Sequence, residues 1–217
     1  SKMEAQKASV KLKGISKKTY EITIKGISPL VMHAWSEKAR EMVRMTPQER
    51  KKLPKVERTP EQTAHECAYR MDDGSFGLPI DAFKKAITEA AHVDDGIAKK
   101  LIRSALFIVA PDKSNCVPLS YVEEPVVTED KVTVGRGQTD LRYRLYFYDW
   151  KATYRCEIDT SKLNLQDVIT LVDRAGFGVG IGDWRPQRDG DKGRFELDKE
   201  AQIGEFGPNG ELIKELI

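Results

Sequence analysis

The sequence has few cysteines and histidines, the residue types that hold zinc or form disulfides, and those it has are scattered. The chain contains three cysteines, with no CxxC pair among them: Cys67, Cys116 and Cys156. The three histidines are equally isolated, and none stands at metal-ligand spacing from another ligand: His33, His65 and His92. We therefore expect neither a zinc site nor a disulfide framework, no cofactor, and no catalytic residue.

The sequence also lacks a long hydrophobic run. Its longest apolar stretch, Leu101–Ala110, is interrupted by Arg103, and the first residues contain no apolar signal core. A membrane span needs about 20 consecutive apolar residues. We therefore expect no membrane partner and a cytoplasmic protein, in a bacterium or a phage-infected host cell.

The net charge of +2 is small, but it is unevenly distributed. From Glu196 onward six acids face two bases, a net of −4, so the preceding part carries +6 (+2 minus −4). Between Lys38 and Arg58 eight bases accompany three acids. This stretch is either a solvated loop or an arm that contacts phosphate or a neighbouring subunit, with Lys51 and Lys52 as candidate contacts.

Hydrophobic periodicity predicts an α+β fold with an antiparallel sheet. Alternation over Tyr20–Ser28 predicts a half-buried strand, and Leu101–Ala110, Leu141–Trp150 and Lys151–Asp159 are further expected strands, the last two paired with each other. Helices are expected over Pro79–His92 and Asn164–Ala175. We expect one domain over residues 1–217, with an inserted basic lobe at about 37–70, a long loop at about 125–140 and an acidic tail at 196–217.

The expected strand at 142–150 carries an unusual set of side chains. Alternation assigns Tyr143, Leu145 and Phe147 to the core. The opposite face then holds two guanidinium groups and three aromatic rings: Arg142, Arg144, Tyr146, Tyr148 and Trp150. On the next strand, Lys151 and Arg155 also point outward. Such a face suits single-stranded nucleic acid, whose bases stack and whose phosphates pair with cations. The alternative is a solvated sheet stabilised by cross-strand aromatic pairs.

A glycine-rich segment follows the helix that ends near Ala175. Four glycines alternate with apolar residues, and an aromatic residue and two arginines come next: Gly176, Gly178, Gly180, Gly182, Trp184, Arg185 and Arg188. A dinucleotide-binding fingerprint lies between a strand and a helix, and a P-loop needs a following GK[ST], so neither applies. The segment is interpreted either as a backbone that tracks nucleic acid or as a close-packed turn.

Several of these pieces together resemble the RAMP superfamily, the RRM-like proteins that form the backbone of CRISPR effector complexes. They are Ile27–Val31, Leu78–Ala86 and the helix Asn164–Ala175 followed by the glycine-rich segment and Arg194-Phe195. The resemblance covers about Lys17–Leu197. It implies a modified RRM or ferredoxin-like sheet with helices on one face, and a subunit that polymerises along a strand. The resemblance is also compatible with a stand-alone relative of these subunits, of the kind that some phages and prophages carry.

Taken together, these features predict sequence-tolerant, non-catalytic binding of single-stranded nucleic acid by a homo-oligomeric filament. DNA is favoured over RNA, because no catalytic site or guide-processing partner is indicated. Two alternatives stay open. One is a metal-independent RNA endonuclease of the same fold, with His33 as general base. The other is a viral assembly protein that uses the glycine-rich segment for subunit packing.

Overall fold

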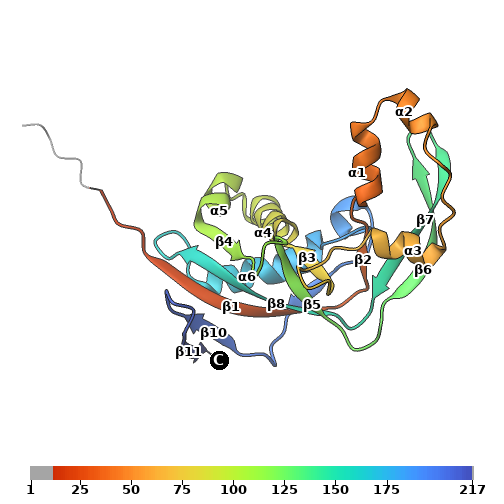
Figure 1. The fold of residues 1–217 in the computed structure, drawn as a ribbon. Coiled ribbons are helices and arrows are strands. Elements are labelled where there is room, and N and C mark those ends of the chain that lie inside the picture. Colours follow the sequence, from red (N-terminus) through yellow and green to blue (C-terminus); the bar gives the residue numbers. More distant parts are fainter. Residues whose placement is uncertain (1–11, 217) are drawn as a thin grey trace, which may run out of the picture.

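A computed structural model describes residues 12–216, which form an α+β fold built on an antiparallel sheet, as the sequence predicted (Figure 1). The strands of the main sheet follow the order β11-β10-β1-β8-β5-β3, with β4 beside β8 and β9 beside β1. Their bounds are β1 (Lys17–Gly26), β3 (Gly77–Pro79), β4 (Leu106–Val109), β5 (Cys116–Ser120), β8 (Lys151–Asp159), β9 (Phe195–Leu197), β10 (Ile203–Phe206) and β11 (Leu212–Leu216).

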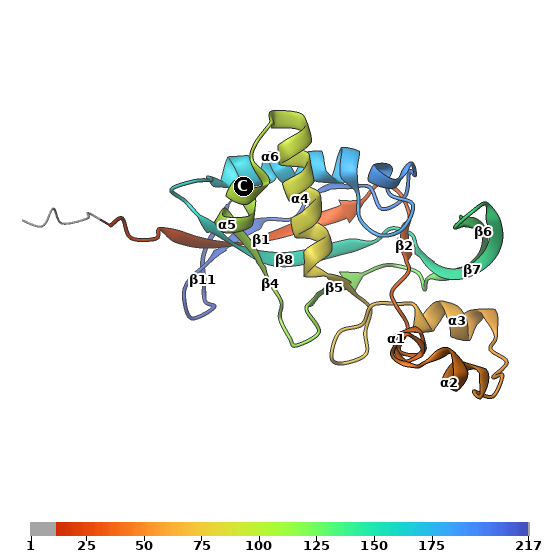
Figure 2. The same cartoon turned by 90° about the horizontal axis from the view of Figure 1, so that it is seen from above.

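Three helices cover one face of this sheet: α4 (Ile80–Asp95), α5 (Lys99–Ala105) and α6 (Leu165–Arg174) (Figures 1 and 2). The alternation expected in β1 holds, since Tyr20, Ile22 and Ile24 are buried. The apolar stripe of α4 packs against this inner face. Asn164 accepts a hydrogen bond from the Asp167 backbone and closes a capping box that starts α6 where it was expected.

Residues 126–140, which we expected as a long loop, instead form most of a β-hairpin. Strand β6 (Val126–Val134) pairs with β7 (Gln138–Phe147), and β7 pairs on its other side with β2 (Leu30–Met32). The expected pairing of β7 with β8 is wrong. Asp149 between them has a φ of 47°, and this left-handed turn passes the chain from the small sheet to the large one.

Two other segments also differ from expectation. Residues 101–110 begin as the end of α5, which buries Ile102 and Ala105, before strand β4 starts. The acidic segment from Glu196 is not a free tail, because its described part forms β9, β10 and β11, the first two paired with β1. The expected domain over 1–217 extends beyond the described residues at both ends. No helix within 12–216 is long and apolar enough to cross a membrane.

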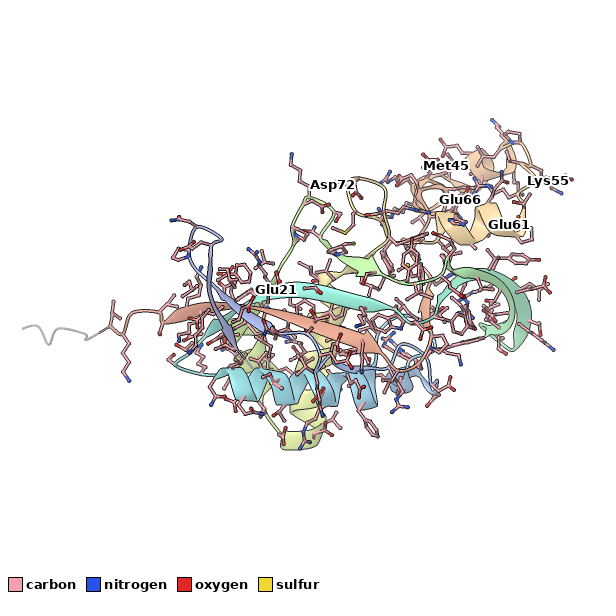
Figure 3. The ribbon with its side chains drawn as sticks, turned by 90° about the horizontal axis from the view of Figure 1, so that it is seen from below. Glu21, Met45, Lys55, Glu61, Glu66 and Asp72 are labelled. Carbon is pink, nitrogen blue, oxygen red and sulfur yellow. The ribbon has the colours of Figure 1, made fainter. Side chains whose placement is uncertain are left out.

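The basic stretch forms a projecting arm, which we define as residues 37–66. It contains α1 (Glu37–Arg44), α2 (Pro47–Lys51) and α3 (Pro60–Glu66), each started by a side-chain cap. Helices α1 and α2 bury no side chain, whereas α3 packs on β7 through the buried Ala64. The arm and the β6–β7 hairpin lie at one end of the molecule, and the β10–β11 hairpin lies at the other (Figures 1 to 3).

Candidate nucleic-acid interface

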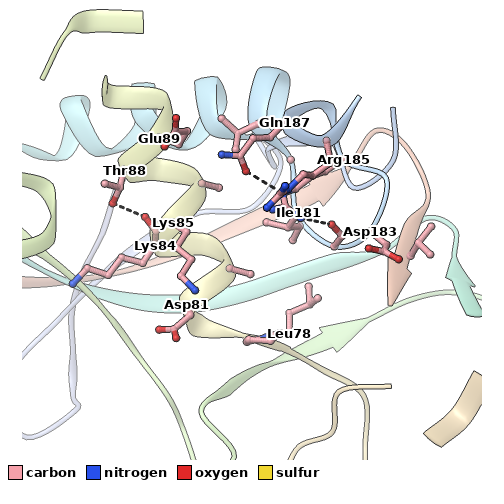
Figure 4. A pocket seen from close by; sticks show the side chains of 18 of the residues that line it. Leu78, Asp81, Lys84, Lys85, Thr88, Glu89, Ile181, Asp183, Arg185 and Gln187 are labelled. Atoms are coloured by element: carbon pink, nitrogen blue, oxygen red, sulfur yellow. Dashed lines mark hydrogen bonds between the residues drawn. The ribbon is translucent and has the colours of Figure 1, made fainter. Parts of the chain in front are cut away.

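A groove of about 940 Å³ lies between α4 and the segment that follows α6 (Figure 4). One wall carries Lys84 and Lys85, and the opposite wall carries Arg185 and Gln187 (Figure 4). The end of β2 forms the floor through Val31 and Met32, and His33 and Tyr69 complete that end. The groove therefore joins residues that are more than 100 positions apart in the chain.

Cations outnumber acids in the groove. Its six cationic residues are Lys84, Lys85, Lys99, Arg103, Arg185 and Arg188, and its three acids are Asp81, Glu89 and Asp183. Two of the acids are already paired, Glu89 with Lys99 at 2.5 Å and Asp183 with Arg144 at 2.5 Å. Net positive charge along a concave surface attracts a polyanion, and low-dielectric walls strengthen the field.

The groove cations differ in how firmly they are held. Lys84 Nζ donates to the carbonyl oxygen of Arg103 at 2.9 Å and lies 3.8 Å above the Phe107 ring, and burial lowers its pKa. Arg185 donates from Nη1 to the Gly182 carbonyl at 2.9 Å. Lys85 and Arg188, by contrast, are exposed and form no ion pair within residues 12–216. These two side chains are available to an incoming phosphate.

The glycine-rich segment is a close-packed turn that forms one wall of the groove. After α6 the chain widens into a π-helical turn, Ala175–Val179, closed by the Gly180 amide donating to the Ala175 carbonyl at 2.8 Å. A Cβ on Gly176 would overlap the Phe195 carbonyl, and one on Gly182 would stand 2.6 Å from the Val31 oxygen. Gly180 and Gly182 have φ of 70° and 78°. Close packing explains three of the four glycines, and Gly178 alone is open and exposed.

Arg144 does not face solvent, and this part of the predicted aromatic face is wrong. Its side chain is completely buried, with Nη2 2.8 Å from Asp130 and Nη1 2.5 Å from Asp183. Its guanidinium also stacks 4.1 Å from the centre of the Trp184 ring. The ion pairs compensate a charge that could not otherwise be buried. The acids lie 14 and 39 residues away, so strand alternation gives no sign of them.

Tyr146 and Trp150 are also buried, contrary to the prediction. The Tyr146 hydroxyl donates to Asp130 at 3.2 Å, and burial followed by the Asp130 charge raises the pKa of Tyr146 to about 12. The Trp150 ring packs over Gly26 and donates to the Ser28 carbonyl at 2.9 Å. The turn at Asp149 breaks the alternation that had assigned Trp150 to the outer face. Of the three aromatic residues, only Tyr148, 48% exposed, keeps the predicted exposure.

The other predicted side chains are divided among separate surfaces. Lys151 pairs with Asp198 at 2.6 Å, and Arg155 pairs with Glu21 at 3.2 Å, on the side of the main sheet opposite the helices. Alternation in β8 explains this, because its neighbouring residues Ala152 and Tyr154 point into the helix-covered core. Neither cation can therefore line the groove. Lys51 and Lys52 are exposed on the arm, also outside it.

Arg142 is half-buried near the arm end of the groove. Burial lowers the pKa of His33, Asp183 partly raises it, and Arg142 lowers it further. Burial raises the pKa of Cys67, and the same guanidinium lowers it. Burial likewise raises the pKa of Tyr69, and the charge of Arg40 lowers it. Arg40 and Arg142 therefore lie near enough to Tyr69 and His33, which line the groove, to act on their charges.

Sequence reasoning missed most of the helical wall. Lys84, Lys85 and Arg103 were not predicted as contacts, and neither was Tyr69. The apolar stripe of α4 was a usable signal, because a stripe that faces the sheet leaves the lysines between its members outside the core. Of the predicted residues, the structure brings together Gly180, Gly182, Arg185 and Arg188.

Comparison with known proteins gives structural matches only. No family model matches the chain, and no curated protein matches it. Cmr6 from Pyrococcus furiosus aligns at 10% identity and a TM-score of 0.44, covering 83% of this chain and 98% of that one. A chain of the Type III-B Cmr-beta complex bound to cognate target RNA aligns at 7% identity and a TM-score of 0.46, covering 87% of this chain and 60% of that one.

A third match is a CRISPR RNA-guided surveillance complex, at 9% identity and a TM-score of 0.35, covering 85% of this chain and 68% of that one.

Replacing Arg144 tests the buried ion pairs. Arg144→Met keeps the length of the side chain but leaves Asp130 and Asp183 without their cation, and we expect a loss of about 3–5 kcal/mol in the free energy of unfolding. Urea denaturation followed by circular dichroism measures this loss. Arg136→Met, on the exposed turn of the same hairpin, is the control and should change stability by less than about 0.5 kcal/mol. Equal stability of the two variants would contradict the assignment.

The glycine-rich segment gives a second prediction. Gly176→Ala forces a methyl group against the Phe195 carbonyl, so we expect destabilisation by about 1–3 kcal/mol. Gly178→Ala meets no atom within 4 Å and should be neutral or slightly stabilising. Thermal unfolding of both variants measures the difference. If Gly178→Ala were the more harmful change, the packing explanation would be wrong.

Proposed function

We propose that this chain binds single-stranded nucleic acid, without cleaving it, in the groove between α4 and the glycine-rich segment. The observation that supports this proposal is the excess of cations along the groove, with Lys85 and Arg188 exposed and lacking an ion-pair partner among the described residues. Lysine and arginine bind phosphate through charge-assisted hydrogen bonds. The Val179–Gly182 backbone lines the same part of the groove.

The chemistry of the groove supports sequence-tolerant binding. Six of its lining side chains are lysine or arginine, which position a nucleic acid through its phosphates without reading its bases. Of the strand first expected to bind, Arg142 and Tyr148 remain candidates, since both are accessible in part. The other members of that set have the internal roles described above, and we propose none of them as a contact.

We further propose DNA as the preferred ligand, as expected from the sequence. Phosphate groups and stacked bases are common to DNA and RNA, so parallel titrations with oligo-dT and oligo-U of equal length test this preference directly. Tighter binding of oligo-dT supports it, and equal binding of the two would contradict it. Tighter binding of oligo-U would overturn the preference and leave the groove assignment intact.

We also propose that copies of the chain assemble head to tail along the strand. The arm is basic and exposes Val43 (63%), whereas the β10–β11 hairpin holds three acids and one lysine and exposes Ile213 (60%). Strand β11 is also an edge of the main sheet, with unpaired backbone groups. These complementary surfaces lie at opposite ends of the molecule (Figure 1). A head-to-tail contact produces a filament when the rotation between successive copies does not close a ring, and we propose this open arrangement.

Charge reversal in the groove tests the binding site. Lys85→Glu and Arg188→Glu should each weaken binding of a fluorescein-labelled oligo-dT by about tenfold or more at low salt, because each change removes a charged phosphate contact. Fluorescence anisotropy measures the affinity. Affinity of the unchanged protein should also fall steeply as salt rises.

Lys113→Glu is the matched control, since Lys113 is exposed outside the groove and carries the same charge. It should bind within about twofold of the unchanged protein. Equal losses for Lys85→Glu and Lys113→Glu would mean that only net charge matters and that the groove is not the site. A flat titration with both oligo-dT and oligo-U would favour the assembly-protein alternative.

Assembly is tested at both ends of the molecule. Val43→Lys on the arm and Ile213→Lys on β11 should each shorten the filaments seen by electron microscopy with single-stranded DNA, because each places a charge in the proposed apolar contact. Val93→Lys, on an equally exposed residue at the end of α4 (68%), should leave them unchanged. Filaments of unchanged length in the first two variants would contradict head-to-tail contact through these surfaces.

One observation favours cleavage as a second candidate function: His33 lines the groove with a pKa lowered chiefly by burial. A neutral imidazole can take the proton of a ribose 2′-hydroxyl. Labelled RNA would then be cut in EDTA, with a rate that falls as the pH drops through a pKa below 6.5. His33→Ala would abolish this cleavage. RNA that stays intact with the unchanged protein removes this candidate.

A further inference from the structure

Trp35 is the exposed aromatic residue at the junction of the groove and the arm. Its side chain is 64% exposed, and it belongs neither to the core nor to an aromatic or cation–π pair within residues 12–216. The other two tryptophans have internal partners: Trp150 is buried in the core, and Trp184 stacks on Arg144. Packing within the described residues therefore explains the presence of Trp150 and Trp184 but not that of Trp35.

The backbone holds Trp35 in a fixed place. The amide of Ala34 donates to the Cys67 carbonyl at 2.7 Å, and Ser36 caps α1 through the Ala39 amide at 3.2 Å. Burial alternates along the segment, with His33 half-buried, Ala34 buried and Trp35 exposed. Two residues of chain span at most about 7 Å, so the Trp35 backbone stands within about 7 Å of His33, which lines the groove. Trp35 itself is not among the lining residues, so it lies outside the groove and next to His33.

Helix capping does not account for the tryptophan. An apolar residue before the N-cap usually packs against an apolar residue four positions into the helix, forming a hydrophobic staple. Here the N-cap is Ser36, and the fourth helical position is Arg40, which forms no cation–π contact among the described residues. The usual partner is replaced by a cation.

The surroundings of Trp35 suit a nucleic acid better than those of other exposed aromatics. Arg40 and Arg142 both act on the groove end beside it, as the pKa shifts of Tyr69 and His33 indicate. Phe177 is as exposed (69%), but the Arg194 guanidinium already stacks 4.8 Å from the centre of its ring, and it lines a separate cavity of about 430 Å³ in which three acids accompany two bases. A ring that already has a stacking partner, beside more acids than bases, is a poorer platform for a nucleotide.

We propose that Trp35 stacks on a base of the bound strand as that strand leaves the groove toward the arm. An indole ring is a large, rigid surface on which any base can stack, so the contact adds affinity without sequence preference. The neighbouring arginines would hold the flanking phosphates. This inference rests on the proposed function and adds to it a base contact, where the groove supplies phosphate contacts.

The test is a double-mutant cycle on protein and ligand, measured by anisotropy. Unchanged protein and Trp35→Ala are each titrated with a 16-nucleotide oligo-dT and with an abasic deoxyribose-phosphate chain of the same length. We expect Trp35→Ala to weaken oligo-dT binding by about five- to a hundredfold, with an unchanged salt slope, because a base contact and no phosphate contact is lost. The two proteins should bind the abasic chain equally.

Trp35→Phe should recover part of the lost affinity, because a phenyl ring also stacks. Phe177→Ala is the control for an exposed aromatic outside the groove and should bind like the unchanged protein. Binding of oligo-dT should also quench tryptophan fluorescence, and this quenching should disappear in Trp35→Phe. Circular dichroism and thermal unfolding of Trp35→Ala should match the unchanged protein, since the ring is exposed.

Three results would overturn the inference. Trp35→Ala could bind oligo-dT as tightly as the unchanged protein, or lose equal affinity for oligo-dT and the abasic chain, which would show that no base is contacted. It could also reduce self-association without nucleic acid, which would make Trp35 part of a protein interface. If the unchanged protein binds neither ligand, the proposed function itself fails, and that outcome is distinct from the other three.

Discussion

The buried guanidinium of Arg144 joins three parts of the structure that are distant in the sequence. Arg144 lies on β7, Asp130 lies on β6, and Asp183 and Trp184 follow the glycine-rich segment. A charge without access to solvent must be paired, so these elements cannot separate without a large loss of free energy. The hairpin is thereby held against the segment that forms one wall of the groove. Asp183 is held in turn through its amide, which donates to the Val31 carbonyl at 2.9 Å.

Close backbone packing determines the shape of that wall. The segment after α6 lies against β2 and β9 at distances that leave no room for a Cβ at Gly176 or Gly182. Because the chain is held so tightly, Arg185 is presented on the groove wall opposite the lysines of α4 (Figure 4). The glycines therefore support the groove through packing, and the charged side chains that follow supply its chemistry.

The two faces of the main sheet use their charges differently. On the outer face, Lys151 and Arg155 are neutralised by Asp198 and Glu21, and the Arg155 guanidinium also stacks 3.7 Å from the centre of the Phe206 ring. In the groove on the helix side, cations outnumber acids, and Lys85 and Arg188 have no ion-pair partner in the described part of the chain. Although the net charge of the sequence is small, the groove and the arm are basic, whereas the charges of Lys151 and Arg155 on the outer face are paired. For a protein that meets a polyanion, this separation matters more than the total.

The amino-acid sequence by itself determined several of the local elements. Alternation placed β1, periodicity placed α4 and α6, and the position of the glycines after a helix excluded a nucleotide-cofactor loop. It also indicated a basic arm and the arginines after the glycines. It did not determine which charges are free. The burial of Arg144, the inward turn of Trp150 and the pairing of Lys151 depend on Asp183, Asp149 and Asp198, which lie on other elements or in a turn. Strand alternation says only that neighbouring side chains point in opposite directions. Whether either direction meets solvent is decided by the tertiary structure, because burial depends on residues distant in the chain that pack against each face.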